Sequence, residues 1–234
     1  MEKMEFKSRK ELEDYISKHQ VKYLGTGIDG KCVLLDNGRV IKLLHNSYDS
    51  KYTLPFKGLK NSSFVFEDEE ICIDNQVWAV LMNEAKGKKV SDYKPLNQDL
   101  LKLGRQLRVL TNDICEISSL GILIQDFHTG NLLYDEDKFT IIDTFQYLML
   151  PGSNYKNDNL REVMTSRNGI YPFLLSEFMN CREFWINNSY YRRMDYIEYP
   201  DHYFEVLKYQ LEKYYGEEIK TLGDAEMVLK RRIK

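Results

Sequence analysis

Residues 124–131 read Ile-Gln-Asp-Phe-His-Thr-Gly-Asn, and residues 132–143 continue as Leu-Leu-Tyr-Asp-Glu-Asp-Lys-Phe-Thr-Ile-Ile-Asp. This stretch predicts two short strands joined by a polar turn. Asp126 is a candidate proton acceptor, and Asn131 and Asp143 offer the oxygen ligands that Mg²⁺ prefers. The pattern is typical of sites that transfer a phosphoryl group. The alternative is that these residues only cap a loop and end a strand, as their types often do.

A glycine-rich segment precedes this stretch. Residues 25–30 read Gly-Thr-Gly-Ile-Asp-Gly, a pattern found both in dinucleotide folds and in phosphate loops between antiparallel strands. No helical period follows it, which excludes the dinucleotide fold. Lys42 lies twelve residues beyond Gly30 on the next predicted strand. A lysine on an apolar strand is costly to bury unless an anion meets it, so nucleotide phosphates are a candidate partner. The alternatives are an ordinary glycine hairpin and a solvent-facing lysine.

The order of predicted elements indicates an α+β fold. Ser8 and Glu11 form a capping-box pattern at the start of an amphipathic helix over residues 8–19. Five antiparallel strands are predicted at residues 21–24, 31–35, 40–44, 64–73 and 77–82, with an acidic interruption at 67–70. Leucines and isoleucines then recur at helical spacing from Leu96 to Ile117. We therefore expect a single domain with a strand-rich lobe, residues 1–85, and a helix-rich lobe, residues 86–234.

Composition limits the partners that we expect. The chain has 234 residues and a formal net charge of -3, which gives no general attraction to nucleic acid. No run approaches the roughly 18 apolar residues of a membrane span, and no signal-peptide core is present, so we expect a cytoplasmic protein without a membrane partner. The four cysteines are dispersed and are interpreted as inert thiols. The basic residues 230–234 are interpreted as ending a last helix capped at Asp224.

The glycine loop, Lys42 and the stretch from Asp126 to Asp143 together resemble the protein-kinase-like superfamily over residues 21–150. The sequence motif at residues 126–131 is more similar to that of the atypical and the aminoglycoside- or choline-kinase-like branches than to that of typical protein kinases. This resemblance implies a two-lobed kinase-like fold with a small antiparallel N-terminal lobe and a shortened helical C-terminal lobe. It also implies ATP and Mg²⁺ as cofactors.

Roles for individual residues follow from the resemblance. Asp126 would be the catalytic base, Lys42 would pair with the α- and β-phosphates, and Asn131 and Asp143 would hold Mg²⁺. The nucleotide would be bound by Gly25, Thr26, Gly27, Ile28, Asp29, Gly30, Val33, Val40, Lys42, Met82, Asn83, Ala85 and Leu133. At the position of Val33, Cys32 is an alternative contact. His128 is interpreted as ordering its loop and less as a base.

The chain also departs from the superfamily. Residues 43–66 contain no Glu to pair with Lys42. Asp49, Glu67, Glu69 or Glu70 would have to substitute. Residues 143–145 read Asp-Thr-Phe where the superfamily has Asp-Phe-Gly, and Ile-Gln replaces the His-Arg pair before Asp126. We therefore expect phosphoryl transfer to a hydroxyl without activation-loop regulation. The expected acceptor is a protein Ser or Thr; a small-molecule hydroxyl or a non-catalytic nucleotide-binding module is the alternative.

Overall fold

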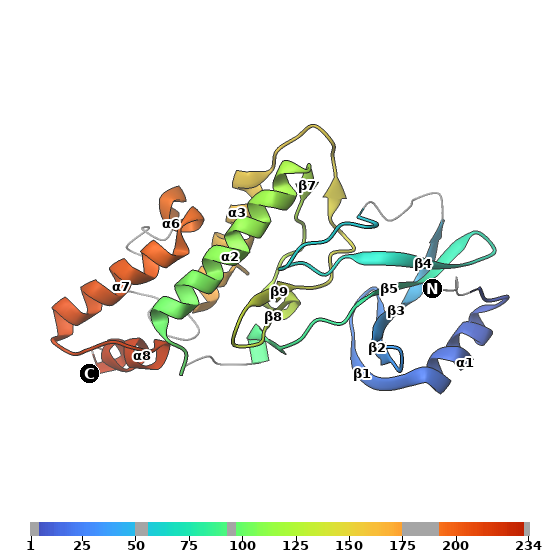
Figure 1. Ribbon diagram of the computed structural model, residues 1–234, viewed down its shortest axis with the longest axis horizontal. Helices are drawn as coiled ribbons and strands as arrows, with labels where there is room; N and C mark the ends of the chain where they lie inside the picture. The colour runs from blue at the N-terminus through green and yellow to red at the C-terminus, as the bar shows by residue number, and fades with distance from the viewer. Residues whose placement is uncertain (1–4, 50–55, 93–96, 175–191, 232–234) are drawn as a thin grey trace. The chain divides into compact units, whose positions relative to one another are not determined.

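The computed structural model describes the chain outside residues 1–4, 50–55, 93–96, 175–191 and 232–234 (Figure 1). Contacts divide the chain into two compact units, each of which is built from segments that are not contiguous. Unit 1 comprises Met1–Asn61, Val65–Ala85 and Asp143–Phe145, and unit 2 comprises Ser62–Phe64, Lys86–Ile142 and Gln146–Lys234. Asp143 therefore belongs with the first part of the chain and not with the strands that precede it in sequence.

Unit 1 is an antiparallel sheet with one helix against it. Its elements are α1 (Arg9–His19), β1 (Gln20–Thr26), β2 (Gly30–Leu35), β3 (Arg39–Asp49), β4 (Glu67–Ile73) and β5 (Gln76–Asn83). The five strands lie in the order β1-β2-β3-β5-β4, and every neighbouring pair is antiparallel. The α+β class and the five antiparallel strands predicted from the sequence are confirmed.

Local residue chemistry sets the ends of these elements. The Ser8 hydroxyl accepts the backbone N–H of Glu11 at 3.2 Å and so caps α1. At the β4–β5 connection, Asp74 and Asn75 both adopt positive φ angles, 51° and 61°. Two consecutive left-handed residues form the tight turn that matches the twist of an antiparallel hairpin, and Asx residues tolerate this conformation best.

The acidic run at residues 67–70 is the first half of β4, so its prediction as an interruption is wrong. Two of its residues find partners on β3, which lies beyond β5 in the strand order. Asp68 forms an ion pair with Arg39, and Glu70 accepts a hydrogen bond from the Tyr48 hydroxyl at 2.9 Å. These partners satisfy Asp68 and Glu70, so two of the four acidic residues of β4 are compensated within the sheet.

The sheet of unit 1 has two apolar faces. The face against α1 is formed by Leu12, Ile16, Val33, Leu35, Ile41, Ile71, Ile73, Ala79 and Leu81. The opposite face is formed by Val40, Leu44, Val77, Val80 and Met82. Because side chains alternate along a strand, Lys42 shares the second face with Val40 and Leu44. This alternation decides which predicted residues lie beside Lys42.

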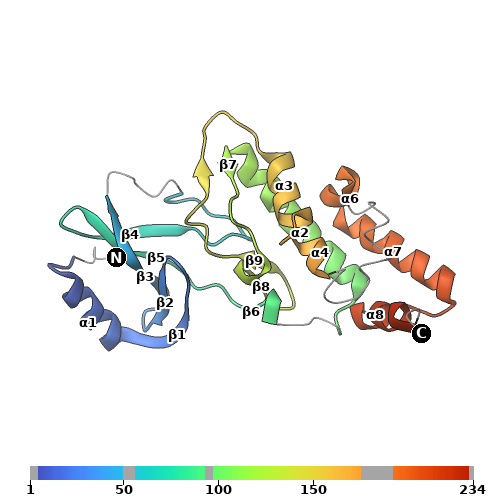
Figure 2. The same ribbon diagram turned by 180° about the vertical axis from the view of Figure 1, so that it is seen from behind.

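Unit 2 is mainly helical (Figure 2). Its elements are β6 (Lys88–Lys89), η1 (Val90–Asp92), α2 (Leu100–Ser119), β7 (Ile122–Leu123), η2 (Thr129–Asn131), β8 (Leu132–Tyr134), β9 (Phe139–Ile141), β10 (Leu148–Met149), α3 (Lys156–Thr165), α4 (Ile170–Pro172), α6 (Met194–Glu198), α7 (Pro200–Tyr215) and α8 (Leu222–Lys230). Helix α2 packs on α3 and α7. The predicted stripe of α2 is confirmed from Leu100 to Ile117, whereas Leu96 lies outside the described residues.

Two details of unit 2 depend on single residues. At Gly104 of α2, a Cβ atom would lie 3.0 Å from the Cα of Asp201, so the glycine lets α2 approach α7 closely.

Helix α8 is capped by Thr221 and not by Asp224 as predicted. Asp224 is instead the third helical residue, and its carboxylate completes a capping box by accepting the backbone N–H of Thr221 at 2.8 Å.

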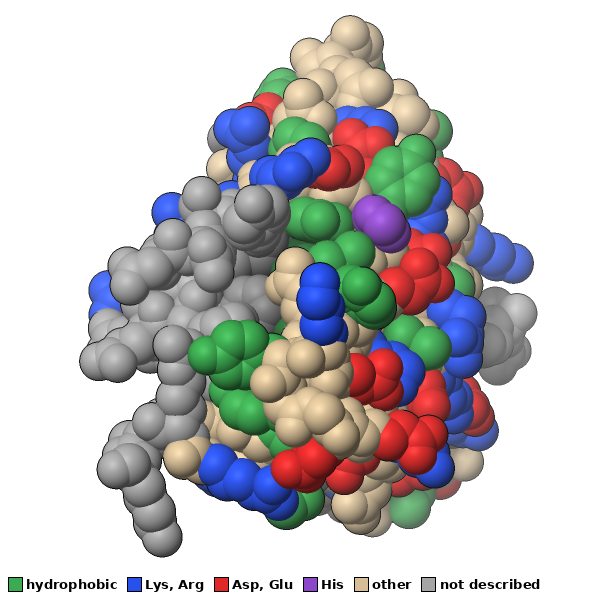
Figure 3. Space-filling view, turned by 90° about the vertical axis from the view of Figure 1, so that its left-hand side faces the viewer, with side chains coloured by type: hydrophobic (Ala, Val, Ile, Leu, Met, Phe, Trp, Pro, Cys, Tyr) green, Lys and Arg blue, Asp and Glu red, His purple; other side chains and the backbone are tan. Residues whose placement is uncertain are grey.

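The described helices include none with the length and apolar character to cross a membrane. On the face drawn in Figure 3, acidic and basic side chains are interspersed and do not gather into a patch of one sign.

Candidate functional site

The glycine loop of unit 1 joins β1 to β2. The Gly27 backbone N–H donates to the carbonyl of Gly30 at 2.9 Å, which closes the loop. At Gly30, a Cβ atom would lie 2.3 Å from the carbonyl oxygen of Leu43 on β3, so only glycine fits there. Ile28 at the tip is 94% exposed. The loop therefore has a constrained base and an open tip, as a phosphate-covering loop requires.

Among the described residues of unit 1, Lys42 on β3 is the buried cation. Its side chain is 5% exposed, and its Nζ lies 2.6 Å from the Asp143 Oδ1 and 3.6 Å from the Asp29 Oδ2. Burial by itself would lower the pKa of Lys42, but the carboxylates of Asp143 and Asp29 outweigh it and raise that pKa above its usual value. The lysine is therefore a charged ammonium group held by two carboxylates, one from the glycine loop and one from residue 143.

None of the four substitute carboxylates proposed from the sequence forms an ion pair with Lys42 among the described residues. Of these four, Glu67 is the one whose electrostatic interaction with Lys42 is resolved. It is fully buried on the Lys42 face, since both Glu67 and Val40 pair with Met82, and Lys42 influences its titration. Burial raises the pKa of Glu67 above its usual value, and the Thr144 hydroxyl, which donates to its Oε2 at 2.9 Å, opposes that rise.

The strand register corrects one predicted nucleotide contact. Val33 pairs with Ile41 and lies on the face against α1, where it is 1% exposed. Cys32 pairs with Lys42 and lies on the opposite face. A one-residue step along a strand turns a side chain to the other face of the sheet. Val33 is therefore a core residue behind the sheet, and the alternative, Cys32, is the neighbour of Lys42.

The remaining predicted contacts of unit 1 lie around β5. Met82 is 7% exposed on the Lys42 face together with Val40. Its carbonyl accepts a hydrogen bond from the Arg39 Nε at 3.1 Å. Asn83 ends β5 and is exposed, and Ala85 follows the strand at intermediate exposure. Among the predicted nucleotide contacts of unit 1, Val40 and Met82 are thus apolar residues that lie on the same face of the sheet as Lys42.

In unit 2, the predicted catalytic loop follows β7. Asp126 is exposed and has a φ of 53°, a left-handed conformation outside any described strand hairpin. Conformations of this kind are concentrated at functional sites, where the surrounding structure holds them. The Asn131 backbone N–H donates to the carbonyl of His128 at 2.8 Å, and Asn131 accepts the N–H of Ile142 at 2.9 Å. Leu133 is 9% exposed on β8.

His128 lies beside Gly130 in this loop. A Cβ atom on Gly130 would approach the His128 Nδ1 to 2.8 Å, so the imidazole packs closely over the glycine. This contact is what the predicted loop-ordering role requires.

Asn159 on α3 holds the segment that leads to Asp126, a role that no sequence pattern predicts. Its Oδ1 accepts the backbone N–H of Ile124 at 2.8 Å, and its Nδ2 donates to the carbonyl of Ile122 at 2.7 Å and to the Ser118 hydroxyl at 2.8 Å. Asn159 is fully buried. Three buried hydrogen bonds from one side chain therefore reinforce the short strand β7, whose two residues also pair with β10.

Glu162, three residues further along α3, was also missed. Burial first, and then the nearby charge of Asp126, raise the pKa of Glu162 above its usual value. The carboxyl group of Glu162 on α3 is therefore close enough to Asp126 for their charges to interact. A Glu on an amphipathic helix is usually a solvent-exposed residue of the polar face. Its spacing in the sequence therefore does not mark Glu162 as a site residue.

The donor chemistry of Asn131 and Asp143 fits Mg²⁺. Both present hard oxygen atoms, and the Asp143 side chain remains 38% exposed in unit 1. Within the described residues, no three His, Cys, Asp or Glu side chains form a metal-binding group. Mg²⁺ at nucleotide sites is usually held by one or two protein side chains together with phosphates and water, so a single exposed carboxylate such as that of Asp143 is compatible with it.

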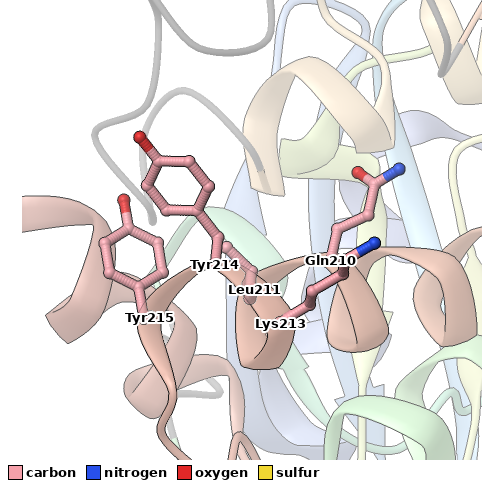
Figure 4. A pocket seen from close by; sticks show the side chains of 5 residues that line it. All are labelled: Gln210, Leu211, Lys213, Tyr214 and Tyr215. Atoms are coloured by element: carbon pink, nitrogen blue, oxygen red, sulfur yellow. The ribbon is translucent and has the colours of Figure 1, made fainter.

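Two hollows in the described surface are lined by neither Asn131 nor Asp143. One lies at the end of α7 and is lined by Gln210, Leu211, Lys213, Tyr214 and Tyr215 (Figure 4). A second lies between α1 and the sheet of unit 1, on the face of Val33. Neither is lined by Lys42 or Asp126. The candidate site is therefore identified by charge and backbone conformation.

No model of a known protein family matches this chain, and a search of curated proteins finds no match either.

Proposed function

We propose that the chain is an ATP- and Mg²⁺-dependent phosphotransferase with a kinase-like fold, which moves the γ-phosphoryl group of ATP to a hydroxyl. One observation carries the proposal. In unit 1, the glycine loop, β3 and the segment after β9 each supply one member of a charged cluster: Asp29, Lys42 and Asp143. A buried ammonium group needs anionic partners, and the phosphates of a nucleotide are of the same kind as the carboxylates that now hold it.

Each residue has a definite task in this proposal. Lys42 would bind the α- and β-phosphates, and Asn131 and Asp143 would hold Mg²⁺, which supplies charge stabilisation at the phosphate oxygens. Asp126 would accept the proton of the attacking hydroxyl. Its oxygen forms a bond to the γ-phosphorus while the bond to the β-phosphate oxygen breaks and ADP leaves. Asp126 is exposed in the described structure, so an acceptor can reach its carboxylate.

The acceptor that we propose is a protein Ser or Thr hydroxyl, with a small-molecule hydroxyl as the alternative. A non-catalytic nucleotide-binding module is a second candidate function. The direct contact between Lys42 and Asp143 at 2.6 Å favours it, because that contact engages the proposed metal ligand.

Two measurements test the proposal. ATP should raise the thermal unfolding midpoint of the full chain, and more so with Mg²⁺ present. Labelled phosphate should then be transferred from ATP to the chain itself or to a generic protein substrate, and Asp126→Asn should abolish transfer while leaving the ATP shift intact. Asp158→Asn, an exposed carboxylate on α3, serves as the matched control. No ATP shift under either condition overturns the proposal, and binding without transfer supports the non-catalytic module.

A further inference from the structure

Thr144 and Glu67 form a buried contact directly beside the proposed metal ligand. The Thr144 Oγ1 lies 2.9 Å from the Glu67 Oε2 and 3.1 Å from the carbonyl oxygen of Val65. Both side chains have no exposed surface. A hydroxyl has a single proton to donate, so the two acceptors share it. The residue that follows Asp143 is thereby attached to β4 and to the segment before it.

The backbone at Asp143 needs such an attachment. Its φ of 62° lies in the left-handed region, which a non-glycine residue adopts only where its surroundings hold it. The Asp143 side chain is 38% exposed, so packing around the carboxylate is incomplete. The buried neighbour, Thr144, supplies side-chain hydrogen bonds that can hold the backbone at this point, in addition to the ion pair of Asp143 with Lys42.

Glu67 is a costly residue to keep for stability alone. Its Oε1 is buried and has no hydrogen-bond partner among the described residues. An unsatisfied buried carboxyl oxygen carries a desolvation penalty, and an apolar side chain of similar size would avoid it. The carboxyl group of Glu67 is therefore better explained by its contact with Thr144 than by a contribution to the stability of the fold.

We propose that Thr144 and Glu67 act as a positioning pair that fixes the carboxylate of Asp143 for a metal cation. This inference rests on the proposed function, since it concerns the same metal ligand. It predicts that Thr144→Val, which keeps the shape and removes the hydroxyl, weakens the Mg²⁺-dependent gain in ATP affinity about tenfold, as expected for the loss of one buried hydrogen bond. Affinity without Mg²⁺ should stay nearly unchanged, because Lys42 retains its place on β3.

The test uses calorimetric titration of the full chain with ATP, with and without Mg²⁺. Thr144→Ser should restore the Mg²⁺-dependent gain because it restores the hydroxyl. Glu67→Met should lower the gain as Thr144→Val does, and the double variant should be no worse than either single one if the two residues act together. Thr111→Val is the matched control, since Thr111 is also buried and its hydroxyl donates to the carbonyl of Arg108 at 2.9 Å within unit 2.

The outcomes separate this inference from the proposed function. If the unaltered chain binds ATP more tightly with Mg²⁺ and Thr144→Val leaves that gain unchanged, the positioning role is wrong and the proposed function stands. The same holds if Thr144→Val lowers affinity equally with and without Mg²⁺, as loss of fold stability would. If the unaltered chain shows no ATP binding, the proposed function fails and this inference fails with it.

Discussion

The Nζ of Lys42 and the Oδ1 of Asp143 lie 2.6 Å apart within unit 1, although 101 positions separate the two residues in the chain. The two ends of this ion pair differ in exposure, because the lysine side chain is 5% exposed and the aspartate side chain 38%. Removal of the aspartate leaves a buried cation with less compensation. Removal of the lysine leaves carboxylates that water can reach.

The first prediction uses this asymmetry. Lys42→Met, which keeps the apolar stem, should change the free energy of unfolding by less than about 1 kcal/mol, because a buried ion pair stabilises little more than an apolar replacement. Asp143→Ala should destabilise the chain by about 1–3 kcal/mol, because it leaves a buried charge with one fewer partner. Urea unfolding measures both values. Lys42→Met should nevertheless abolish the ATP-induced shift; equal losses of stability in the two variants would show that Lys42 is structural.

The second prediction concerns the clamp formed by Asn159. Asn159→Ala removes three buried hydrogen bonds and leaves the N–H of Ile124 unsatisfied, so it should destabilise unit 2 by about 3 kcal/mol. Asn157→Ala is the control, since Asn157 is exposed on the same helix and should change stability by less than about 0.5 kcal/mol. Hydrogen exchange should show faster exchange at Ile124 in the first variant alone. Unchanged protection at that amide would contradict the clamp.

The sequence predicted the local parts of this structure because their causes are local. The α1 cap at Ser8 and the leucine stripe of α2 depend on residues within one or two helical turns. The face of the sheet on which Val33 lies could also be predicted from the sequence. The predicted turn at residues 36–38 makes Cys32 the partner of Lys42 and Val33 the partner of Ile41, so counting back from the turn gives the register.

The charge partners depend on tertiary structure and carry no such signal. Asp143 reaches Lys42 only because residues 143–145 belong to unit 1, a placement that no period in the sequence encodes. The role of Asn159 cannot be predicted from the sequence either. An Asn on an amphipathic helix usually faces water, whereas Asn159 is fully buried. The acidic run of β4 was misjudged because its partners Arg39 and Tyr48 come from another strand.

The third prediction contrasts two glycines of the same loop. Gly30→Ala should destabilise unit 1 by about 1–3 kcal/mol, because its Cβ would meet the carbonyl oxygen of Leu43 at 2.3 Å and push β2 from β3. Gly27→Ala meets nothing within 4 Å, so we expect a change below about 0.5 kcal/mol. Thermal and urea unfolding of the two variants should rank them in that order. A Gly27→Ala variant as unstable as Gly30→Ala would refute the close approach as the cause.

The fourth prediction is a pH dependence at the start of α8. The Asp224 Oδ2 accepts the backbone N–H of Thr221 at 2.8 Å and that of Lys220 at 3.0 Å. These bonds, the one from Thr221 first, lower the pKa of Asp224 below its usual value of 3.8. Because the pKa in the folded chain is the lower one, the carboxylate stabilises the fold above about pH 3.8, and this contribution is lost as the pH falls through the folded pKa.

Asp224→Asn should therefore cost about 1 kcal/mol at pH 7, the usual value of a helix cap, and the difference from the unaltered chain should shrink at pH values below about 3.8. Urea unfolding of both proteins at pH 7 and pH 3 measures the two differences. Glu218→Gln is the control, because Glu218 forms only an exposed ion pair with Lys220 in the same loop and should change stability by less than about 0.5 kcal/mol. A difference for Asp224→Asn that is equal at both pH values would mean that shape, and not charge, stabilises this cap.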